Sequence, residues 1–226
     1  MRVSKDVGSS EEPWSFVGTG DGTDEFYILK AIAERYGGPR TLWFPKSPLG
    51  KNTGLSVLDS INTVVARYPK VSAFLFLIDR EHIGWELDNF GIKEMIERQL
   101  SNGHVKIIET SDNTPNGAFM IKGELGSHKL QIYVTIHGID LKIEEEISKL
   151  IELEKKRTIP PEKTHLKDFF EEMYRKRNVW QGAAKLIMHA NKNNLKISFP
   201  AMTSILSEMG LQLQSTEPTS RPELRT

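Results

Sequence analysis

The stretch "VSAFLFLID", residues 71–79, decides the fold that this sequence predicts. Seven of its nine residues are apolar, without the polar alternation of a half-buried strand. A strand with two apolar faces is typical of a parallel sheet that helices cover on both sides. The stretch therefore predicts a central, buried strand that ends at Asp79.

Strand and helix patterns alternate on either side of this central strand. Helices are predicted from apolar residues at helical spacing, and strands from short apolar runs bounded by turn residues. Further strands are expected at 14–17, 41–44, 105–110 and twice within 117–138, and helices at 24–36, 55–68, 85–100 and 143–157. This alternation indicates an α/β protein with an open, mostly parallel sheet flanked by helices.

The composition changes at "RTIPPEKT", residues 157–164, where two consecutive prolines break any helix. Beyond this linker the spacing of apolar residues is helical, and between 162 and 200 there are eight basic residues and four acidic ones. The chain is therefore expected to comprise a flexible N-terminus (1–13), an α/β domain (14–156), the linker (157–164), a basic helical segment (165–211) and a disordered tail (212–226).

The composition of the 226-residue chain excludes several classes of site. There is no cysteine, which rules out disulfides, thiolate metal sites and a cysteine nucleophile. The 30 basic and 30 acidic residues cancel, so the net charge favours no class of partner. The N-terminus has no apolar signal segment, and no 18-residue apolar run occurs. A cytoplasmic protein without a membrane span is the expectation.

Ionisable side chains follow three of the predicted strands, at the points where the strands end. In chain order they are Asp21, Asp24, Asp79, Glu81, His137 and Asp140. The carboxyl ends of parallel strands share one edge of a sheet, where open α/β sheets bind ligands. Carboxylates gathered there repel one another unless a cation joins them or one takes a proton. Oxygen ligands favour Mg²⁺ or Mn²⁺, and such an ion supports chemistry at phosphoesters.

Each of these side chains also has an ordinary structural interpretation. Asp24 is suited to cap the following helix, and Asp21 to shape a glycine-rich turn. His137 is equally interpreted as a polar residue after a strand. The acidic triplet Glu144–Glu146 is interpreted as a solvated first turn of a helix, where acids favour the helix dipole.

Two segments together resemble a known family. "GDGTDE" (20–25), which opens a helix, and "DRE" (79–81), which follows the buried strand, resemble the two motifs of the Toprim fold. That fold occurs in topoisomerases, primases and the nucleases of the overcoming-lysogenization-defect family. The resemblance covers residues 14–155, and it implies a Mg²⁺-dependent or Mn²⁺-dependent site that cuts, joins or polymerises nucleic acid.

The resemblance implies roles for individual side chains. The family's second motif reads Asp-x-Asp and holds metal, and Asp79 and Glu81 match those acids. Its first motif carries a Glu-Gly pair. A gapless match places Gly20 where the family has its glutamate, and a shift of one residue places Thr19 or Asp21 there. The implied set is catalytic Asp21, Asp79 and Glu81, metal-holding Asp24, Asp79 and Glu81, and accessory His137 and Asp140.

Three classes of function remain open. The first is a metal-dependent nuclease or related phosphoryl-transfer enzyme on DNA or RNA, with phosphate contacts from Arg175, Lys176, Arg177 and Lys185. The second is a catalytically degenerate module that binds nucleic acid or protein, in which Tyr174 and Trp180 stack on bases or pack in a core. The third is a nucleotide-binding protein of another α/β class, because "GTGDG" (18–22) precedes a helix, although it lacks the lysine and spacing of phosphate loops.

Overall fold

The computed structural model describes residues 1–6, 14–20, 24–38, 40–46, 53–84, 86–111 and 117–211. The predicted tail (212–226), most of the predicted flexible N-terminus and Asp21 lie outside these residues. The strands within them are β1 (Arg2–Ser4), β2 (Trp14–Thr19), β3 (Thr41–Trp43), β4 (Ala73–Asp79), β5 (Lys106–Thr110), β6 (Ala118–Leu125) and β7 (His128–His137).

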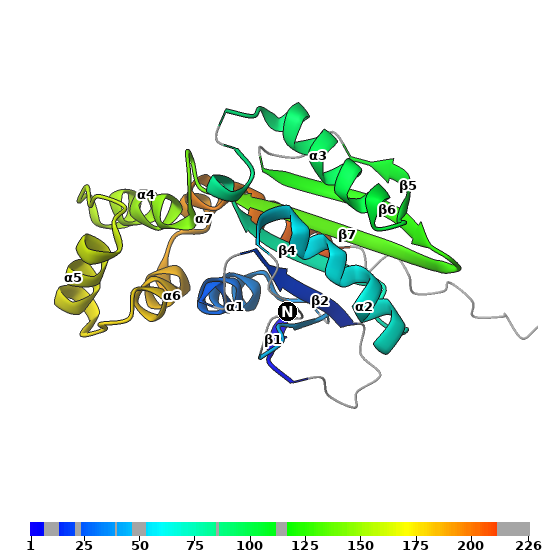
Figure 1. Ribbon diagram of the computed structural model, residues 1–226. Coiled ribbons are helices and arrows are strands. Elements are labelled where there is room, and N and C mark those ends of the chain that lie inside the picture. The colour runs from blue at the N-terminus through cyan, green and yellow to red at the C-terminus, as the bar shows by residue number, and fades with distance from the viewer. Residues whose placement is uncertain are drawn as a thin grey trace, which may run out of the picture.

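These strands form one seven-stranded sheet with the order β1-β3-β2-β4-β7-β6-β5 (Figure 1). The pairs from β1 to β7 in that order are parallel. The pairs of β6 with β7 and of β5 with β6 are antiparallel. The prediction of an α/β protein with an open, mostly parallel sheet is therefore confirmed.

Helices cover both faces of the sheet. On one face lie the 3-10 helix η1 (Gly54–Asp59), α2 (Ser60–Arg67) and α3 (Asn89–Asn102). The other face carries α1 (Glu25–Tyr36), α4 (Ile143–Lys155), α5 (Lys163–Tyr174), α6 (Val179–His189), α7 (Lys192–Ser198) and α8 (Pro200–Leu211). In Figure 1, α2 and α3 lie in front of the sheet and α4, α5 and α6 lie together at its left end.

The central strand β4 explains why two separate cores form. All seven of its residues are buried. Phe74 and Phe76 pack with η1, α2 and α3, whereas Leu75 and Leu77 pack with α1 and α8 on the other face. Successive side chains of a strand point to opposite faces, so an uninterrupted apolar run supplies both cores at once.

The N-terminal residues differ from the sequence-based expectation. Arg2–Ser4 forms β1, which pairs in parallel with β3 at one edge of the sheet, where a flexible segment was expected. Met1 and Val3 are buried, and the terminal ammonium donates to the carbonyl oxygen of Ala33, 3.1 Å away. Two apolar side chains packed against α1 thus hold an otherwise polar segment in the sheet.

The C-terminal helices pack directly on the α/β core. Gly182 of α6 contacts Phe170 of α5 so closely that an added Cβ would lie 2.4 Å from a ring carbon. The guanidinium of Arg35 in α1 donates to the carbonyl oxygens of Ile187 and Ala190 at the end of α6. Apolar side chains of α5 to α8 belong to the same buried cluster as those of α1. No helix in the described ranges has the length and apolar character needed to cross a membrane.

Candidate functional site

The strand order places a switch point between β2 and β4. From β2 the chain passes through α1 to β3 on one side, and from β4 it passes through α3 and the β5–β6 hairpin to β7 on the other. Where outgoing connections diverge in this way, the helices leave a crevice at the carboxyl ends of the strands. The ends of β2 and β4, at Thr19 and Asp79, therefore mark the expected ligand position.

Three segments meet closely at this edge. The amide of Gly20, just after β2, donates to the Leu77 carbonyl oxygen at 2.9 Å, and the amide of Gly54 donates to that of Gly20 at 3.1 Å. A Cβ on Gly54, whose φ is 55°, would lie 2.9 Å from the carbonyl oxygen of His82. Glycine is needed there because the left-handed backbone and the close approach both exclude a side chain.

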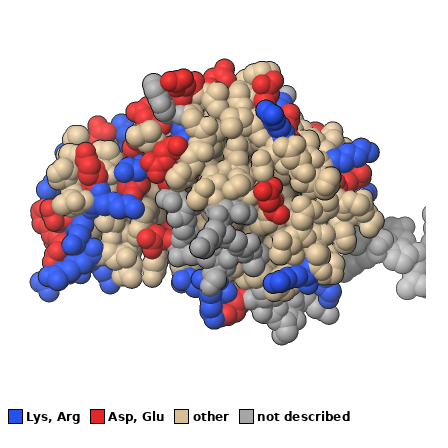
Figure 2. Space-filling view, viewed as in Figure 1, with Lys and Arg blue, Asp and Glu red and all other residues tan. Residues whose placement is uncertain are grey.

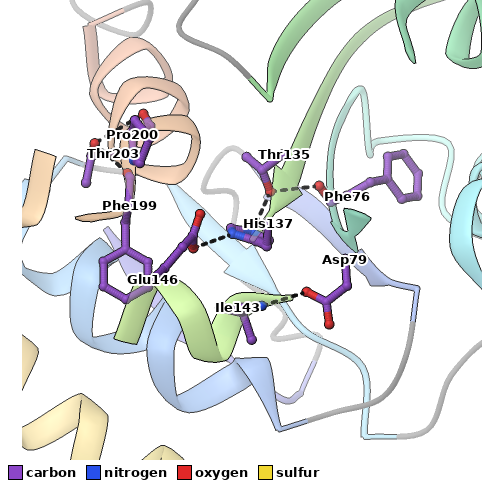
Figure 3. Close-up of polar contacts among 9 residues, drawn as sticks. All are labelled: Phe76, Asp79, Thr135, His137, Ile143, Glu146, Phe199, Pro200 and Thr203. Carbon is purple, nitrogen blue, oxygen red and sulfur yellow. Dashed lines mark hydrogen bonds and ion pairs between the residues drawn. The ribbon is translucent and has the colours of Figure 1, made fainter. Parts of the chain in front are cut away.

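Asp79 is the last residue of β4 and is buried, with 7% of its surface exposed. One carboxyl oxygen accepts a hydrogen bond of 3.3 Å from the amide of Ile143, the first residue of α4 (Figure 3). Across the strand pair its partner is His137, the last residue of β7. The start of α4 therefore covers Asp79 and holds its carboxyl at the sheet edge.

His137 sits in a chain of buried hydrogen bonds (Figure 3). Its Nδ1 lies 2.9 Å from a carboxyl oxygen of Glu146, and its Nε2 lies 2.9 Å from the hydroxyl of Thr135. That hydroxyl donates its hydrogen to the carbonyl oxygen of Phe76, so it accepts from His137. Both ring nitrogens consequently act as donors, which describes an imidazolium ion.

The protonation of this pair follows from its surroundings. Burial lowers the pKa of His137, but the charge and hydrogen bond of Glu146, together with the charges of Asp79 and Glu25, outweigh it, and the net pKa is raised. Burial raises the pKa of Asp79 to about 7; the His137 charge opposes this rise, whereas the charges of Glu25 and Glu144 add to it. Asp79 is therefore a carboxyl group that changes protonation state near neutral pH.

Glu25, Glu144 and Glu146 also belong to this cluster and were not predicted from the sequence. Glu25 is the first residue of α1, and all three side chains are buried. Glu144 and Glu146 lie beside Ile143 and Ile147, two apolar positions four residues apart, which was the available signal that this side of α4 faces inward. The interpretation of the whole triplet as a solvated first turn is wrong for these two residues.

The other predicted site residues lie in different surroundings. Glu81 belongs to the 3-10 helix η2 (Arg80–His82), with its amide bonded to the Leu141 carbonyl oxygen and its side chain partly exposed. Asp24 is exposed and forms no side-chain cap hydrogen bond on α1. Asp140 is exposed, and its amide donates to Glu145.

Among the residues that the structure describes, no three His, Asp or Glu side chains form a group that could hold a metal ion. Asp21, the predicted replacement for the family's glutamate, lies outside those residues. The described part of the chain therefore brings Asp79 and His137 together, but it does not complete a metal site.

The predicted nucleic-acid contacts lie on the C-terminal helices. Arg177 is held by Glu171, with 2.9 Å between its Nε and a carboxyl oxygen. Lys185 lies over the ring of Tyr174 in α5, at 5.2 Å from the centroid. Trp180 is buried in the helical core, with the ammonium of Lys163 5.5 Å from its ring centroid, so core packing is its role. Arg175 and Lys176 are exposed.

No family model, curated protein or solved structure matches this chain. The class of the protein is thus defined by its own architecture, an α/β fold with a mixed, mostly parallel sheet and a buried ionisable cluster at the carboxyl ends of β4 and β7. Its resemblance to the Toprim fold stays a prediction.

Proposed function

We propose that the edge between β2 and β4 is a phosphoryl-transfer site for nucleic acid, where the chain acts as a Toprim-like, metal-dependent nuclease or related enzyme. The observation that carries this proposal is Asp79, a buried carboxyl at the switch point of the sheet. Burial together with the charges of Glu25 and Glu144 raises its pKa to about 7. Strongly perturbed carboxyls at such positions are typical of functional sites.

Asp79 is suited to move a proton at neutral pH. A general acid or base works best when its pKa lies near the working pH. The hydrogen bond from the Ile143 amide fixes one carboxyl oxygen, and the His137 imidazolium beside it favours the ionised form. Asp79 would accordingly orient or deprotonate an attacking water, while Glu146 keeps His137 charged and in place.

Mg²⁺ or Mn²⁺ is the cofactor that belongs to this proposal. When bound, such an ion would neutralise phosphate charge and lower the pKa of its water. The Toprim resemblance implies that Asp79 would hold it with Asp24 and Glu81, although these three do not form one metal-holding group among the described residues. A cation at Asp79 would relieve its repulsion with Glu25 and Glu144. Since the described residues do not complete a site, a ligand from the turn after β2, such as Asp21, is required.

A second candidate is a catalytically degenerate module that binds nucleic acid or protein through the same scaffold. The observation that favours it is the lack of a complete metal-holding group among the described residues. The position of the family's glutamate, which a gapless match gives to Gly20, points the same way. Such a module would bind in the presence or absence of metal and would not turn over.

A cleavage assay distinguishes the two candidates. The full chain is incubated with single-stranded and double-stranded DNA and RNA in Mg²⁺, Mn²⁺ or EDTA. The variant Asp79→Asn keeps the shape of the side chain and removes its acid, and Asp168→Asn, at an exposed position of α5, is the matched control.

Metal-dependent cleavage by the wild type and by Asp168→Asn, with at least a hundredfold loss in Asp79→Asn, is the expected outcome. Binding without cleavage would favour the degenerate module. Neither cleavage nor binding would remove the support for any role in nucleic-acid chemistry. Cleavage that survives in Asp79→Asn would show that the reaction takes place elsewhere.

A further inference from the structure

Three side chains from three helices meet on the surface at Tyr174. The ammonium of Lys155, at the end of α4, lies 6.0 Å from the ring centroid, and that of Lys185 in α6 lies 5.2 Å from it. Phe170 stacks on the same ring at 6.2 Å with an interplanar angle of 19°. The Tyr174 ring thus attracts two ammonium groups that come from two different helices.

The charges around this ring have no carboxylate partner in the described structure. Five cations share that property: Lys155, Lys156, Arg175, Lys176 and Lys185. They are called the cationic cluster here. Lys155 and Lys185 lie next to the Tyr174 ring. Lys156 follows Lys155 in the chain, and Arg175 and Lys176 follow Tyr174. Figure 2 shows Lys and Arg gathered at the end of the molecule where α4, α5 and α6 lie.

Neighbouring cations differ from the cluster in being neutralised. Arg157 binds both carboxyl oxygens of Glu172, at 2.9 and 3.2 Å, and Arg177 binds Glu171. The chain as a whole has no net charge. An unpaired concentration of positive charge on such a chain raises the local concentration of a polyanion, whereas a solvated surface would normally intersperse both signs.

Two members of the cluster have a possible structural explanation. Lys156 and Arg175 follow the last residues of α4 and α5 in left-handed conformations, where a positive charge interacts favourably with the helix dipole. That explanation does not extend to Lys155 and Lys185, which meet at one ring from two different helices. The test therefore uses these two lysines.

The helix α4 connects the cluster to the candidate active site. Its first residue, Ile143, contacts Asp79, and its last residue is Lys155. Thirteen helical residues span about 20 Å, which equals the length of about six base pairs of duplex. The cluster therefore lies about 20 Å from the contact of α4 with Asp79, a separation that one bound nucleic acid can span.

We propose that the cationic cluster binds the phosphate backbone of a nucleic acid whose scissile end lies about 20 Å away at Asp79. This inference rests on the proposed function for the identity of the polyanion. Lys155 and Lys156 were not among the contacts expected from the sequence, and they extend the binding surface from the C-terminal segment onto the α/β core.

Binding is measured in EDTA by fluorescence anisotropy, so that it does not depend on turnover. The probes are labelled duplexes of four and twelve base pairs and single strands of equal length. The test variant is Lys155→Gln/Lys185→Gln. The matched control is Lys70→Gln/Lys129→Gln. Both lysines are exposed and have no carboxylate partner among the described residues. Lys70 precedes β4 and Lys129 lies at the start of β7, so both are at the opposite end of these strands from Asp79 and His137.

The wild type and the control are expected to bind the twelve-mers alike, and the test variant about tenfold more weakly at moderate salt. The slope of log affinity against log salt should fall by about 2 for duplex, one unit for each lost phosphate contact. The four-mers, too short to reach both sites, should bind weakly. Melting temperatures should match among the three proteins.

Equal binding by test variant and wild type, or equal loss in the control, would overturn the proposal. Capture by vesicles containing phosphatidylserine without oligonucleotide binding would also overturn it and would identify a membrane surface instead. The experiments distinguish a failure of the proposed enzyme activity from a failure of the proposed binding by the cationic cluster. Binding that depends on the cluster without any cleavage contradicts the enzyme alone, and cleavage that is unaffected in the test variant contradicts the cluster alone.

Discussion

Asp79 and His137 occupy paired positions at the ends of two neighbouring parallel strands, so that a carboxyl and an imidazole are buried side by side at one edge of the sheet. A carboxyl oxygen of Glu146 lies at hydrogen-bond distance from Nδ1 of His137, and the amide of Ile143, at the start of α4, donates to the carboxyl of Asp79. Both contacts come from the first four residues of α4. The position of that helix therefore sets two of the polar contacts at this edge, while Glu25 of α1 adds a further charge.

The raised pKa of Asp79 makes stability depend on pH with a definite sign. The folded state holds the proton up to about pH 7, whereas an unfolded chain releases it near 3.8. The folded state binds more protons between these values, so the free energy of unfolding falls as pH rises from about 4 to 7. The difference between the folded and unfolded pKa values limits this fall in the free energy of unfolding to about 4 kcal/mol.

Asp79→Asn should remove this penalty, because an amide resembles the neutral acid. We expect little change in urea-derived stability below about pH 4, and a gain that develops between about pH 4 and 7 and reaches about 1–3 kcal/mol at pH 8 to 9. Asp168→Asn, exposed on α5, should track the wild type throughout. A loss of stability in Asp79→Asn that is equal at every pH would instead assign Asp79 a purely structural hydrogen-bonding role.

Glu146→Gln should destabilise the fold, because it leaves the buried His137 without its counter-charge. Breaking a buried ion pair costs about 3 kcal/mol or more. The raised pKa of His137 stabilises the fold below the unfolded value of 6.5, and that contribution is lost as pH rises through the folded pKa. The variant's deficit should therefore be largest at pH 5 to 6.

The control for this prediction is the exposed pair of His165 and Glu162, which has the same chemistry at 3.1 Å. Glu162→Gln should leave the free energy of unfolding close to that of the wild type, since exposed ion pairs contribute little. NMR titration of the His137 ring measures its pKa directly. If its pKa in the wild type lay below 6.5, the imidazolium assignment would be wrong.

The sheet could be predicted from the sequence because its central strand is apolar on both faces. Residues 71–79 carry that pattern within nine positions, and β4 forms there. The edge strand β1 could not be predicted in the same way. It has three residues, and its pairing with β3 depends on α1 bringing distant segments together. Local patterns do not contain such non-local contacts.

The residues of the candidate site also differ in whether local sequence patterns predict them. Asp79 and His137 follow strands, so the rule for carboxyl ends of strands identified both. Glu144 and Glu146 lie in the first turn of a helix, where acids are common on solvated surfaces. Their burial results from the packing of α4 over the sheet edge, a tertiary contact that their charge does not indicate and that only the spacing of the neighbouring Ile143 and Ile147 suggests.

The close packing of α5 against α6 leads to a prediction about how the C-terminal helices unfold. Gly182→Ala would place a methyl group 2.4 Å from a carbon of Phe170, and such overpacking costs about 1–3 kcal/mol. In α8, the nearest atom to a Cβ on Gly210 is 3.9 Å away, so Gly210→Ala should be neutral or stabilising by up to about 1 kcal/mol. Urea unfolding that shows one transition in both variants would mean that these helices unfold with the sheet.

The glycine contact at the switch point yields the last prediction. Gly54→Ala introduces both a left-handed alanine, at φ 55°, and a Cβ 2.9 Å from the His82 carbonyl oxygen. Gly126→Ala, at φ 59° in the turn between β6 and β7, also places an alanine at positive φ but with no atom within 4 Å of its Cβ, so it isolates the first cost. We expect a loss of about 1 kcal/mol for Gly126→Ala and of about 2–4 kcal/mol for Gly54→Ala.

Because His82 lies three residues beyond Asp79, relief of that contact must move the segment that follows β4. At a temperature where Gly54→Ala is still folded, its cleavage activity should accordingly be lower than that of the wild type. In Gly126→Ala the activity should be retained. Parallel effects of the two substitutions on stability and activity would show that the close packing of Gly54 against His82 has no part in positioning the site.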